Sequence, residues 1–157
     1  MRNKETARLR AAWIPQARSE VLEIGIGSGL NLPFYSHDVQ RVYGVDPSVE
    51  LQRMARKKRL AEPTKLEFLL QSAEDRLPLP DSSFEIRDSR FDTAIITWTL
   101  CPLDAPRALQ QVNRVLKMSG RLIFVQHGNS PDLGVAVWQE RLTPLWKRIG
   151  GGCHLNR

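Results

Sequence analysis

Short apolar runs rich in Val, Ile, Leu and Phe recur along the chain, and each run is bounded by polar residues, Gly or Pro. Runs of this length that end at turn-forming residues are typical of buried β-strands. The pattern predicts five strands, over residues 21–24, 41–45, 65–70, 91–98 and 121–125.

Between these runs the apolar residues are spaced by three or four positions, which is the period of an amphipathic helix. This spacing predicts helices over residues 3–18, 48–60, 104–116 and 133–149. Pro15 weakens the end of the first helix, and Pro144 is expected to divide the last helix into two pieces. Residues 117–120 are expected to form a turn before the fifth strand.

Strands and helices therefore alternate along most of the chain. Such alternation is typical of an α/β fold with parallel strands, right-handed crossovers and helices on both faces of the sheet. Ligands of such sheets bind beyond the carboxyl ends of the strands, close to the point where the strand order reverses. The residues that follow the predicted strands are therefore the first candidates for a site.

The chain has 157 residues, of which 41% are hydrophobic and 25% charged, so it can form one domain with its own core. The composition excludes collagen-like, low-complexity and disulfide-rich secreted proteins. No apolar run is long enough to cross a membrane as a helix, and no apolar segment marks a secretion signal. Cys101 and Cys153 lie far apart and form no metal-binding pair, which favours the reducing cytoplasm and no metal site.

Basic residues outnumber acidic ones, 23 against 17, which gives a net charge of +6. The excess lies in residues 1–18 and in the segment RMARKKR at 53–59. In the second segment basic and apolar residues fall on opposite faces of the predicted helix, so a solvated helix face is favoured over an anionic partner. No aromatic residues suited to stacking bases are interleaved with these cations, which disfavours a nucleic-acid partner.

The strongest local motif is VLEIGIGSG at residues 21–29, where a predicted strand runs into three glycines. Glycine lets the backbone turn sharply and approach a ligand closely. The nicotinamide-binding fingerprint G-x-G-x-x-G is not met, because Leu30 and Leu32 occupy its last position in the two possible registers. No P-loop Lys follows the glycines either. Glu23, inside the strand, favours a cationic ligand over a pyrophosphate.

Asp46 ends the second predicted strand, about 20 residues after the glycine loop. An acidic residue at this place can accept hydrogen bonds from both hydroxyls of a ribose. Asp46 and Pro47 can equally begin a turn and cap the next helix. The glycine loop one strand earlier favours the ribose interpretation.

Together these motifs resemble those of the class I S-adenosylmethionine-dependent methyltransferases. The resemblance extends from residue 21 to about residue 127 and includes YGVDPS at 43–48, SAEDRLPLP at 72–80 and RVLK at 114–117. The segments TWTLCP at 97–102 and WKRIGGGCHLNR at 146–157 are similar to the branch of thiol- and ubiquinone-type methyltransferases. The resemblance implies a Rossmann-like three-layer sandwich, S-adenosylmethionine as cofactor and a small-molecule methyl acceptor.

The resemblance also implies roles for particular residues. The three glycines would surround the methionine portion of the cofactor, and Glu23 would orient its ammonium. Asp46 would hold the ribose, residues 72–74 would border the adenine, and Thr97 and Trp98 would line the cofactor and face the substrate. The residues implied in cofactor binding are Glu23, Gly25, Gly27, Gly29, Asp46, Pro47, Ser72, Ala73, Glu74, Thr97 and Trp98.

The chain departs from the family pattern at several positions. Ser72 stands where many relatives have Asp, and Gln126 stands where Glu is common. The similar segments DSSFE at 81–85 and DSRFD at 88–92 replace a single segment of the relatives, which predicts a longer or disordered loop.

Five strands are accounted for, whereas the family's sheet normally has seven, closed by a C-terminal hairpin. We therefore expect one domain over residues 1–157 that is C-terminally incomplete, with a cofactor-binding core at 20–128 and a helical substrate-side segment at 131–149. A partner subunit, as in a homodimer, is one way to cover the exposed edge of the fifth strand.

Methyl transfer needs a general base only if the acceptor arrives protonated. His127, at the carboxyl end of the fifth strand, is the best-placed candidate, although a structural histidine explains it equally well. Cys101 is expected to line a pocket or the core as a small hydrophobe.

The segment 133–149 carries an apolar stripe that includes Trp138, Leu142 and Trp146. Packing against the sheet is the favoured interpretation. A lid over an apolar substrate and a peripheral contact with a membrane or lipid are the alternatives.

The sequence thus predicts a cytoplasmic methyltransferase that acts on a small, lipophilic acceptor by in-line displacement. An S-adenosylmethionine-binding protein without catalysis is the main alternative. An RNA-modifying methyltransferase and a nucleotide-dependent oxidoreductase are less favoured.

Overall fold

The computed structural model describes residues 4–58, 64–78, 91–101, 103–128 and 130–149. Its centre is a sheet in which every strand pair is parallel. The strands follow the order β3-β2-β1-β4-β5. They are β1 (Ser19–Ile24), β2 (Val39–Val45), β3 (Lys65–Leu69), β4 (Phe91–Thr97) and β5 (Leu116–Val125).

The strand order reverses next to β1. The chain runs outward from β1 to β3, then returns to place β4 on the other side of β1. The carboxyl ends of β1 and β4 therefore flank the point where ligands of such sheets bind. The predicted α/β fold with a parallel sheet is confirmed.

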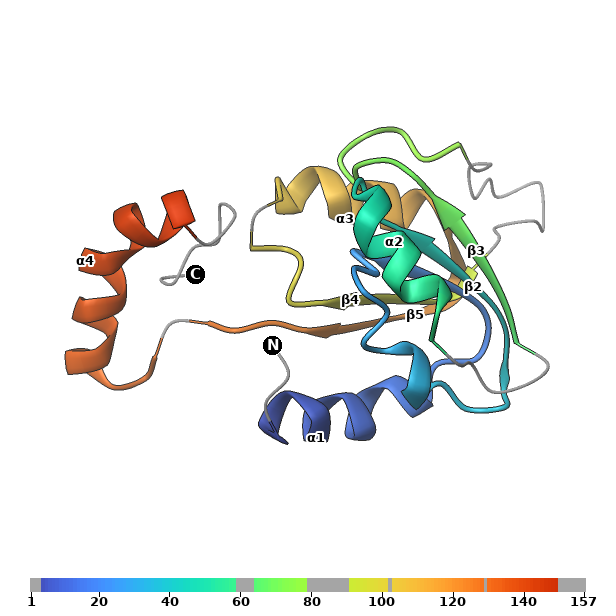
Figure 1. Cartoon of the computed structure of the whole chain (residues 1–157), viewed down its shortest axis with the longest axis horizontal. Coiled ribbons are helices and arrows are strands. Elements are labelled where there is room, and N and C mark those ends of the chain that lie inside the picture. The colour runs from blue at the N-terminus through green and yellow to red at the C-terminus, as the bar shows by residue number, and fades with distance from the viewer. Residues whose placement is uncertain (1–3, 59–63, 79–90, 102, 129, 150–157) are drawn as a thin grey trace.

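Helical segments connect the strands and lie on both faces of the sheet, with α1 on one side and α3 on the other (Figure 1). The helical segments of the described residues are α1 (Lys4–Trp13), η1 (Ile14–Gln16), η2 (Leu32–Phe34), α2 (Val49–Arg56), α3 (Ala105–Val115) and α4 (Leu133–Ile149), of which α1 and η1 precede β1 and α4 follows β5. The first predicted helix is interrupted where Pro15 stands, and the chain continues there as the short 3-10 helix η1.

Two apolar layers hold the sandwich together. On one face Leu22, Ile24 and Ile96 of the central strands pack with Ala108 and Val112 of α3. The other layer combines side chains of β1, β2, β4 and β5 with those of η1, η2 and α2: Ile14, Ala17, Val21, Ile26, Leu32, Tyr35, Val39, Val42, Ala55, Ile95 and Ile123. The three-layer arrangement predicted from the family resemblance is thus present.

The two crossover helices begin at side-chain caps. The Ser48 hydroxyl accepts a hydrogen bond from the backbone N–H of Leu51, and the Asp104 side chain accepts one from Arg107. With these caps α2 begins four residues after the end of β2, and α3 begins eight residues after the end of β4.

The predicted turn at 117–120 is wrong, because these residues belong to β5. Phe91 pairs with Leu116 and Thr93 with Arg121, so the register shifts between the two pairs. The extra residues are accommodated as an irregularity within the strand. The Lys117 Nζ also donates to Asp92 Oδ1 at 2.8 Å, which ties this irregular part of β5 to β4.

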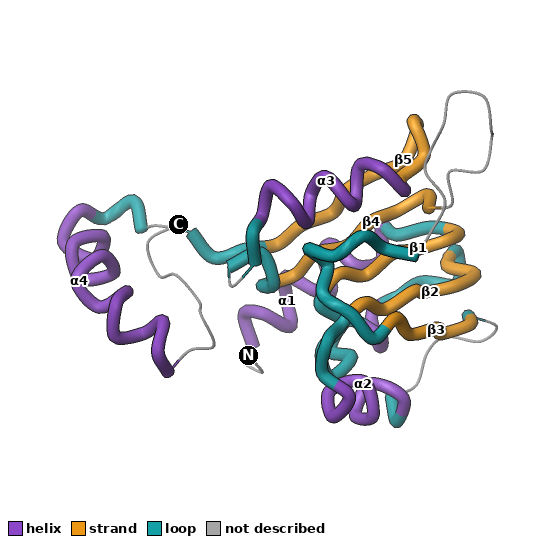
Figure 2. Tube along the Cα trace, turned by 90° about the horizontal axis from the view of Figure 1, so that it is seen from above, coloured by secondary structure: helices purple, strands orange, loops and turns teal. Residues whose placement is uncertain are grey.

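The predicted division of the last helix is also wrong, because α4 continues through Pro144 as one helix. Its predicted packing against the sheet is not found either. In both views α4 stands apart from the sheet (Figures 1 and 2), and Trp138 and Leu145 are 61% and 60% exposed. No part of the sheet that the structure describes covers this stripe.

Some predictions fall outside the described residues. Most of the duplicated segment lies at 79–90, and Cys153 lies at 150–157. Among the helices that are described, none combines the length and apolar character that crossing a membrane requires.

Candidate functional site

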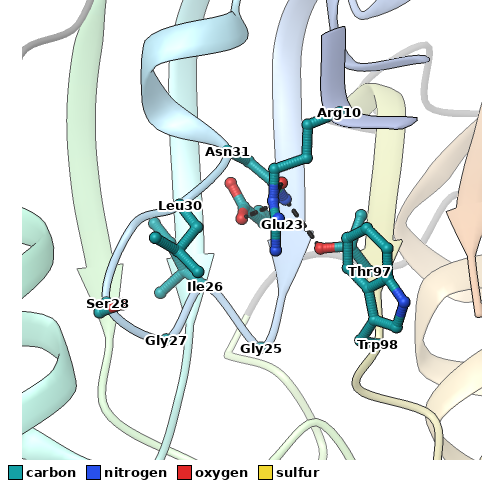
Figure 3. A pocket seen from close by; sticks show the side chains of 10 residues that line it. All are labelled: Arg10, Glu23, Gly25, Ile26, Gly27, Ser28, Leu30, Asn31, Thr97 and Trp98. Carbon is teal, nitrogen blue, oxygen red and sulfur yellow. Dashed lines mark hydrogen bonds between the residues drawn. The ribbon is translucent and has the colours of Figure 1, made fainter. Parts of the chain in front are cut away.

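A pocket of about 150 Å³ opens at the carboxyl ends of β1 and β4 (Figure 3). It lies where the reversal of strand order predicts a ligand. The residues that line it are Arg10, Glu23, Gly25, Ile26, Gly27, Ser28, Leu30, Asn31, Thr97 and Trp98.

The glycine loop forms one wall of this pocket. Gly25, Gly27 and Gly29 all have positive φ angles, of 68°, 53° and 73°. A Cβ on Gly25 would strike the side chain of Thr99, whereas the nearest atom to a Cβ on Gly27 would be 3.9 Å away. Gly25 therefore permits close packing against the end of β4, while Gly27 keeps the pocket side of the loop open.

Glu23 lies at the base of the pocket and is 1% exposed. Its Oε1 accepts a hydrogen bond from Asn31 Nδ2 at 2.9 Å, and its Oε2 accepts one from the Tyr35 hydroxyl at 2.6 Å. Burial raises the pKa of Glu23 to about 7, although these two hydrogen bonds and nearby Arg10 act in the opposite direction. A cationic ligand beside this carboxyl would favour its ionised form.

Asn31 connects three elements at the floor of the site. In addition to Glu23 on β1, its Nδ2 donates to Thr97 Oγ1 on β4 at 2.9 Å. Its Oδ1 accepts a hydrogen bond from Arg10 Nε on α1 at 3.0 Å. The side-chain amide thus holds the carboxyl ends of both central strands and the first helix in one network.

Trp98 forms the opposite wall and has an unusual backbone conformation. Its φ angle is 53°, which is rare for a residue with a Cβ. The backbone N–H of Trp98 donates to Val125 O at 2.8 Å, so pairing with β5 holds this conformation. The ring lies 4.4 Å from the guanidinium carbon of Arg10, in a cation–π contact.

Asp46 reaches the glycine loop from the end of β2. Its Oδ2 accepts a hydrogen bond from Gly27 N, and its Oδ1 accepts one from Ser48 N, both at 2.9 Å. The carboxylate therefore both orders the loop and begins the turn into α2. Each carboxylate oxygen has a further lone pair, so Asp46 retains capacity to accept hydroxyl groups.

The segment 72–74 follows β3 and lies outside the pocket lining. Ala73 is buried in the core layer that includes α3. The Glu74 Oε1 accepts a hydrogen bond from the backbone N–H of Asp104, at the start of α3, and the Ser72 hydroxyl accepts one from Glu74 N. These contacts join the loop after β3 to the loop after β4.

Of the predicted site residues, the structure gathers Glu23, Gly25, Gly27, Thr97 and Trp98 around the pocket. Gly29, Asp46, Pro47, the segment 72–74 and His127 are not part of the lining. Gly29 packs against Leu32 and Ala55. Pro47 is exposed, and His127 is half-buried just beyond β5. Cys101 is buried, in agreement with its predicted role as a small hydrophobe.

Sequence reasoning missed Arg10, Asn31 and Tyr35. Arg10 looks like one more cation of a basic helix, although it is the one arginine of α1 that is buried. Asn31 and Tyr35 follow the glycine loop closely, and this proximity to Glu23 was the available signal. Within the described ranges, no group of three or more His, Cys, Asp or Glu side chains is arranged to hold a metal ion.

Comparison with known proteins identifies the family to which this chain belongs. The sequence model of the family described as "Methyltransferase domain" matches residues 22–124, from the second half of β1 through most of β5. The thiol S-methyltransferase TMT1B of Rattus norvegicus is 38% identical over 142 residues, covering 87% of this chain and 54% of that protein. The chain thus spans about half the length of this curated relative.

Solved structures show the same architecture. The YcgJ protein from Bacillus subtilis has a TM-score of 0.68 and 26% identity, and the match covers 96% of this chain and 60% of that one. A complex of DhpI with SAH has a TM-score of 0.58 and 25% identity, and the match covers 78% of this chain and 54% of that one. The chain therefore belongs to the methyltransferase domain family, in agreement with the class I resemblance of its motifs.

Proposed function

We propose that this chain binds S-adenosylmethionine at the carboxyl ends of β1 and β4 and transfers its methyl group to a small, lipophilic acceptor. The observation that carries the proposal is the glycine loop, which Asp46 holds through Gly27 N at 2.9 Å beside a pocket with Glu23 at its base. SAH is also the ligand named in the structure of DhpI.

The residues present fit this cofactor. A drug-sized ligand needs roughly 300–1,000 Å³, so a pocket of about 150 Å³ suits one end of such a molecule. The buried Glu23 carboxyl matches an ammonium, and the remaining lone pairs of Asp46 match the ribose hydroxyls. A Cβ on Gly27 would have its nearest neighbour 3.9 Å away, so the loop leaves room beside this residue.

The cofactor, when bound, supplies a sulfonium methyl group that a nucleophile can displace. Such a displacement gains mostly from alignment of the reacting atoms and from exclusion of water. The glycine loop and the Asn31 network would fix the cofactor, and Trp98 would shield one side of it. We assign His127, half-buried at the carboxyl end of β5, as the candidate general base for an acceptor that arrives protonated.

A thiol is the acceptor class that we propose to test first. The similarity to a thiol S-methyltransferase supports this choice. A free thiol has a pKa near 8.5, so it would arrive mainly protonated at neutral pH and would gain from a base. The exposed apolar stripe of α4 supports a lipophilic acceptor, which the stripe would cover as a lid.

The proposal also includes the predicted domain organisation, location and partners of this protein. They are a single domain with its cofactor-binding core at 20–128, a cytoplasmic location, a homodimer and a contact with lipid. Loss of catalysis with retained cofactor binding stays the main alternative. No observation favours the RNA-modifying or nicotinamide-dependent alternatives.

Calorimetric titration with S-adenosylhomocysteine and with NAD tests the cofactor assignment. We expect saturable binding of S-adenosylhomocysteine and no binding of NAD. Asp46→Ala should weaken the binding of S-adenosylhomocysteine at least 10-fold, because both the ribose contacts and the hydrogen bond to Gly27 N are lost. Asp38→Ala, which changes an exposed acid, is the matched control.

Turnover with a series of alkyl thiols, phenols and quinol precursors then tests catalysis. Methylation of apolar thiols supports the proposal, and binding without turnover of any acceptor favours the non-catalytic alternative. Equal affinity of the wild-type chain and the Asp46→Ala variant would overturn the site assignment.

A further inference from the structure

Arg10 is the single residue of α1 that is buried, with 6% of its surface exposed. A buried guanidinium needs hydrogen-bond partners, because removing its charge from water is costly. The Arg10 Nε donates to Asn31 Oδ1 at 3.0 Å, and no other hydrogen bond of this side chain is made to the described residues.

The terminal nitrogens of the Arg10 guanidinium are available to a ligand in the pocket, which Arg10 lines. A guanidinium has five N–H groups, and the four on its terminal nitrogens have no acceptor among the described residues. Trp98 covers one face of the group at 4.4 Å, which leaves its edge for a ligand. Figure 3 shows this side chain extending from α1 toward the space between Glu23 and Trp98.

The pocket therefore presents one cationic and one carboxyl group to whatever it holds. The part of the structure that is described shows no direct ion pair between Arg10 and Glu23, because each of them bonds to Asn31 instead. A guanidinium and a carboxyl group that line one pocket complement an α-amino acid, which carries a carboxylate and an ammonium on the same carbon. The planar fork of Arg suits a carboxylate, to which it can donate two parallel hydrogen bonds.

The geometry points to Arg10 as the residue that binds the α-carboxylate of S-adenosylmethionine, while Glu23 faces the ammonium of the same amino-acid group. This inference rests on the proposed function. It assigns a role to a residue outside the segment 22–124 that the family sequence model matches. The first helix would thus supply part of the cofactor site.

The test combines a variant of the residue with a change in the ligand. The affinities of S-adenosylhomocysteine and of its decarboxylated analogue are measured by calorimetry for the 157-residue chain and for Arg10→Gln. The exposed Arg8 provides the matched control, Arg8→Gln, on the same helix. Thermal unfolding of each variant shows whether the fold is retained.

We expect Arg10→Gln to weaken the binding of S-adenosylhomocysteine roughly 10- to 100-fold, as loss of a charge-assisted pair does. The decarboxylated analogue should bind to Arg10→Gln and to the wild-type chain with the same affinity, and Arg8→Gln should change neither. An equal loss for both ligands, or no loss, would overturn the role of Arg10.

If Arg10→Gln does not fold, the affinities of the two ligands for the wild-type chain still test the inference. Removal of the carboxylate should weaken binding to the wild-type chain by a similar factor, and unchanged affinity would overturn the inference. Failure of the wild-type chain to bind S-adenosylhomocysteine at all would instead overturn the proposed function, and the inference with it.

Discussion

At the scale of single residues, the burial of the Glu23 carboxyl is an electrostatic cost to the site. It is enclosed by Asn31 and Tyr35, and burial raises its pKa to about 7 from an unperturbed value of 4.5. Each of its oxygens accepts one hydrogen bond, which is less than a carboxylate receives in water. Burial therefore favours the protonated form of this carboxyl.

The free energy of unfolding should depend on pH through Glu23. Between pH 4.5 and about 7 the unfolded chain releases this proton while the folded chain retains it, so stability should fall as the pH rises. The fall should amount to about 3 kcal/mol and level off above pH 7. Urea unfolding at pH 5 and pH 8 measures it.

Glu23→Gln is the control for this prediction, because an amide does not titrate in this range. The variant should lose less stability than the wild-type chain between the two pH values, by about 3 kcal/mol. The same pH dependence in both chains would show that Glu23 is not the group responsible.

The site could be predicted from the sequence only where backbone geometry dictates the residue type. Gly25 and Gly27 were identifiable because a strand that turns at positive φ favours glycine. Arg10 was not identifiable, because its burial depends on how α1 lies over the sheet rather than on its neighbours in the chain. Asn31 was missed for the same reason, since its partners Thr97 and Arg10 are distant in sequence.

At the scale of elements, α1 is attached to the sandwich by few contacts. Arg10 is its one buried residue, and Trp13 at its end is 47% exposed. A helix of 10 residues has little stability of its own, so its order depends on tertiary contacts. A ligand that engages Arg10 would add a contact at the point where the helix meets the pocket.

Binding of S-adenosylhomocysteine should therefore slow amide hydrogen exchange in α1. We expect protection of residues 5–13 to increase several-fold at saturating ligand, because the bound state suppresses local opening. Exchange in α3, on the opposite face of the sheet, should change much less and serves as an internal reference. Equal changes in both helices would indicate global stabilisation without a specific effect on α1.

Element types were more predictable than element boundaries. All five strands were expected, since buried parallel strands read as apolar runs. The predicted start of β5 was wrong because Lys117 and Ser119 look like turn residues, whereas the strand includes them as an irregular part between its pairs at Leu116 and Arg121. The interruption at Pro144 was wrong, because the loss of one backbone N–H donor does not end α4, which continues to Ile149.

At the scale of the whole molecule, the sandwich and α4 differ in how they are held. Phe91 is fully buried and packs edge-on against Tyr43 with 5.3 Å between ring centroids. Trp138 of α4 is 61% exposed, and its ring lies 6.0 Å from the guanidinium carbon of Arg141 on the same helix. Core packing therefore determines the stability of the sandwich, to which the apolar stripe of α4 adds little.

Substitutions at these two aromatic residues should separate stability from substrate binding. Phe91→Ala should lower the free energy of unfolding by about 3–5 kcal/mol, because it opens a cavity in the core. Trp138→Ala should change it by less than about 0.5 kcal/mol. Urea unfolding measures both values, and a large loss for Trp138→Ala would show that α4 packs on the sandwich in solution.

Trp138→Ala should nevertheless weaken the binding of apolar acceptors if α4 acts as a lid. The expected sign is a higher KM for long-chain alkyl thiols with little change for short ones. Unchanged KM values across such a series would exclude the lid and leave the stripe without a role in acceptor binding.

The central position of β1 also determines how this chain must fold. β1 pairs with β2 on one side and with β4 on the other. β4 is synthesised only after β2, β3 and the long segment that follows β3, so the pairing of β1 with β4 comes late. Such non-local pairing slows folding and leaves an unpaired strand in the partly folded chain. A ligand seated across both strand ends can bind only after they have joined, so it would slow unfolding without accelerating folding. Cofactor added during refolding would therefore act on the lifetime of the native state rather than on the speed of reaching it.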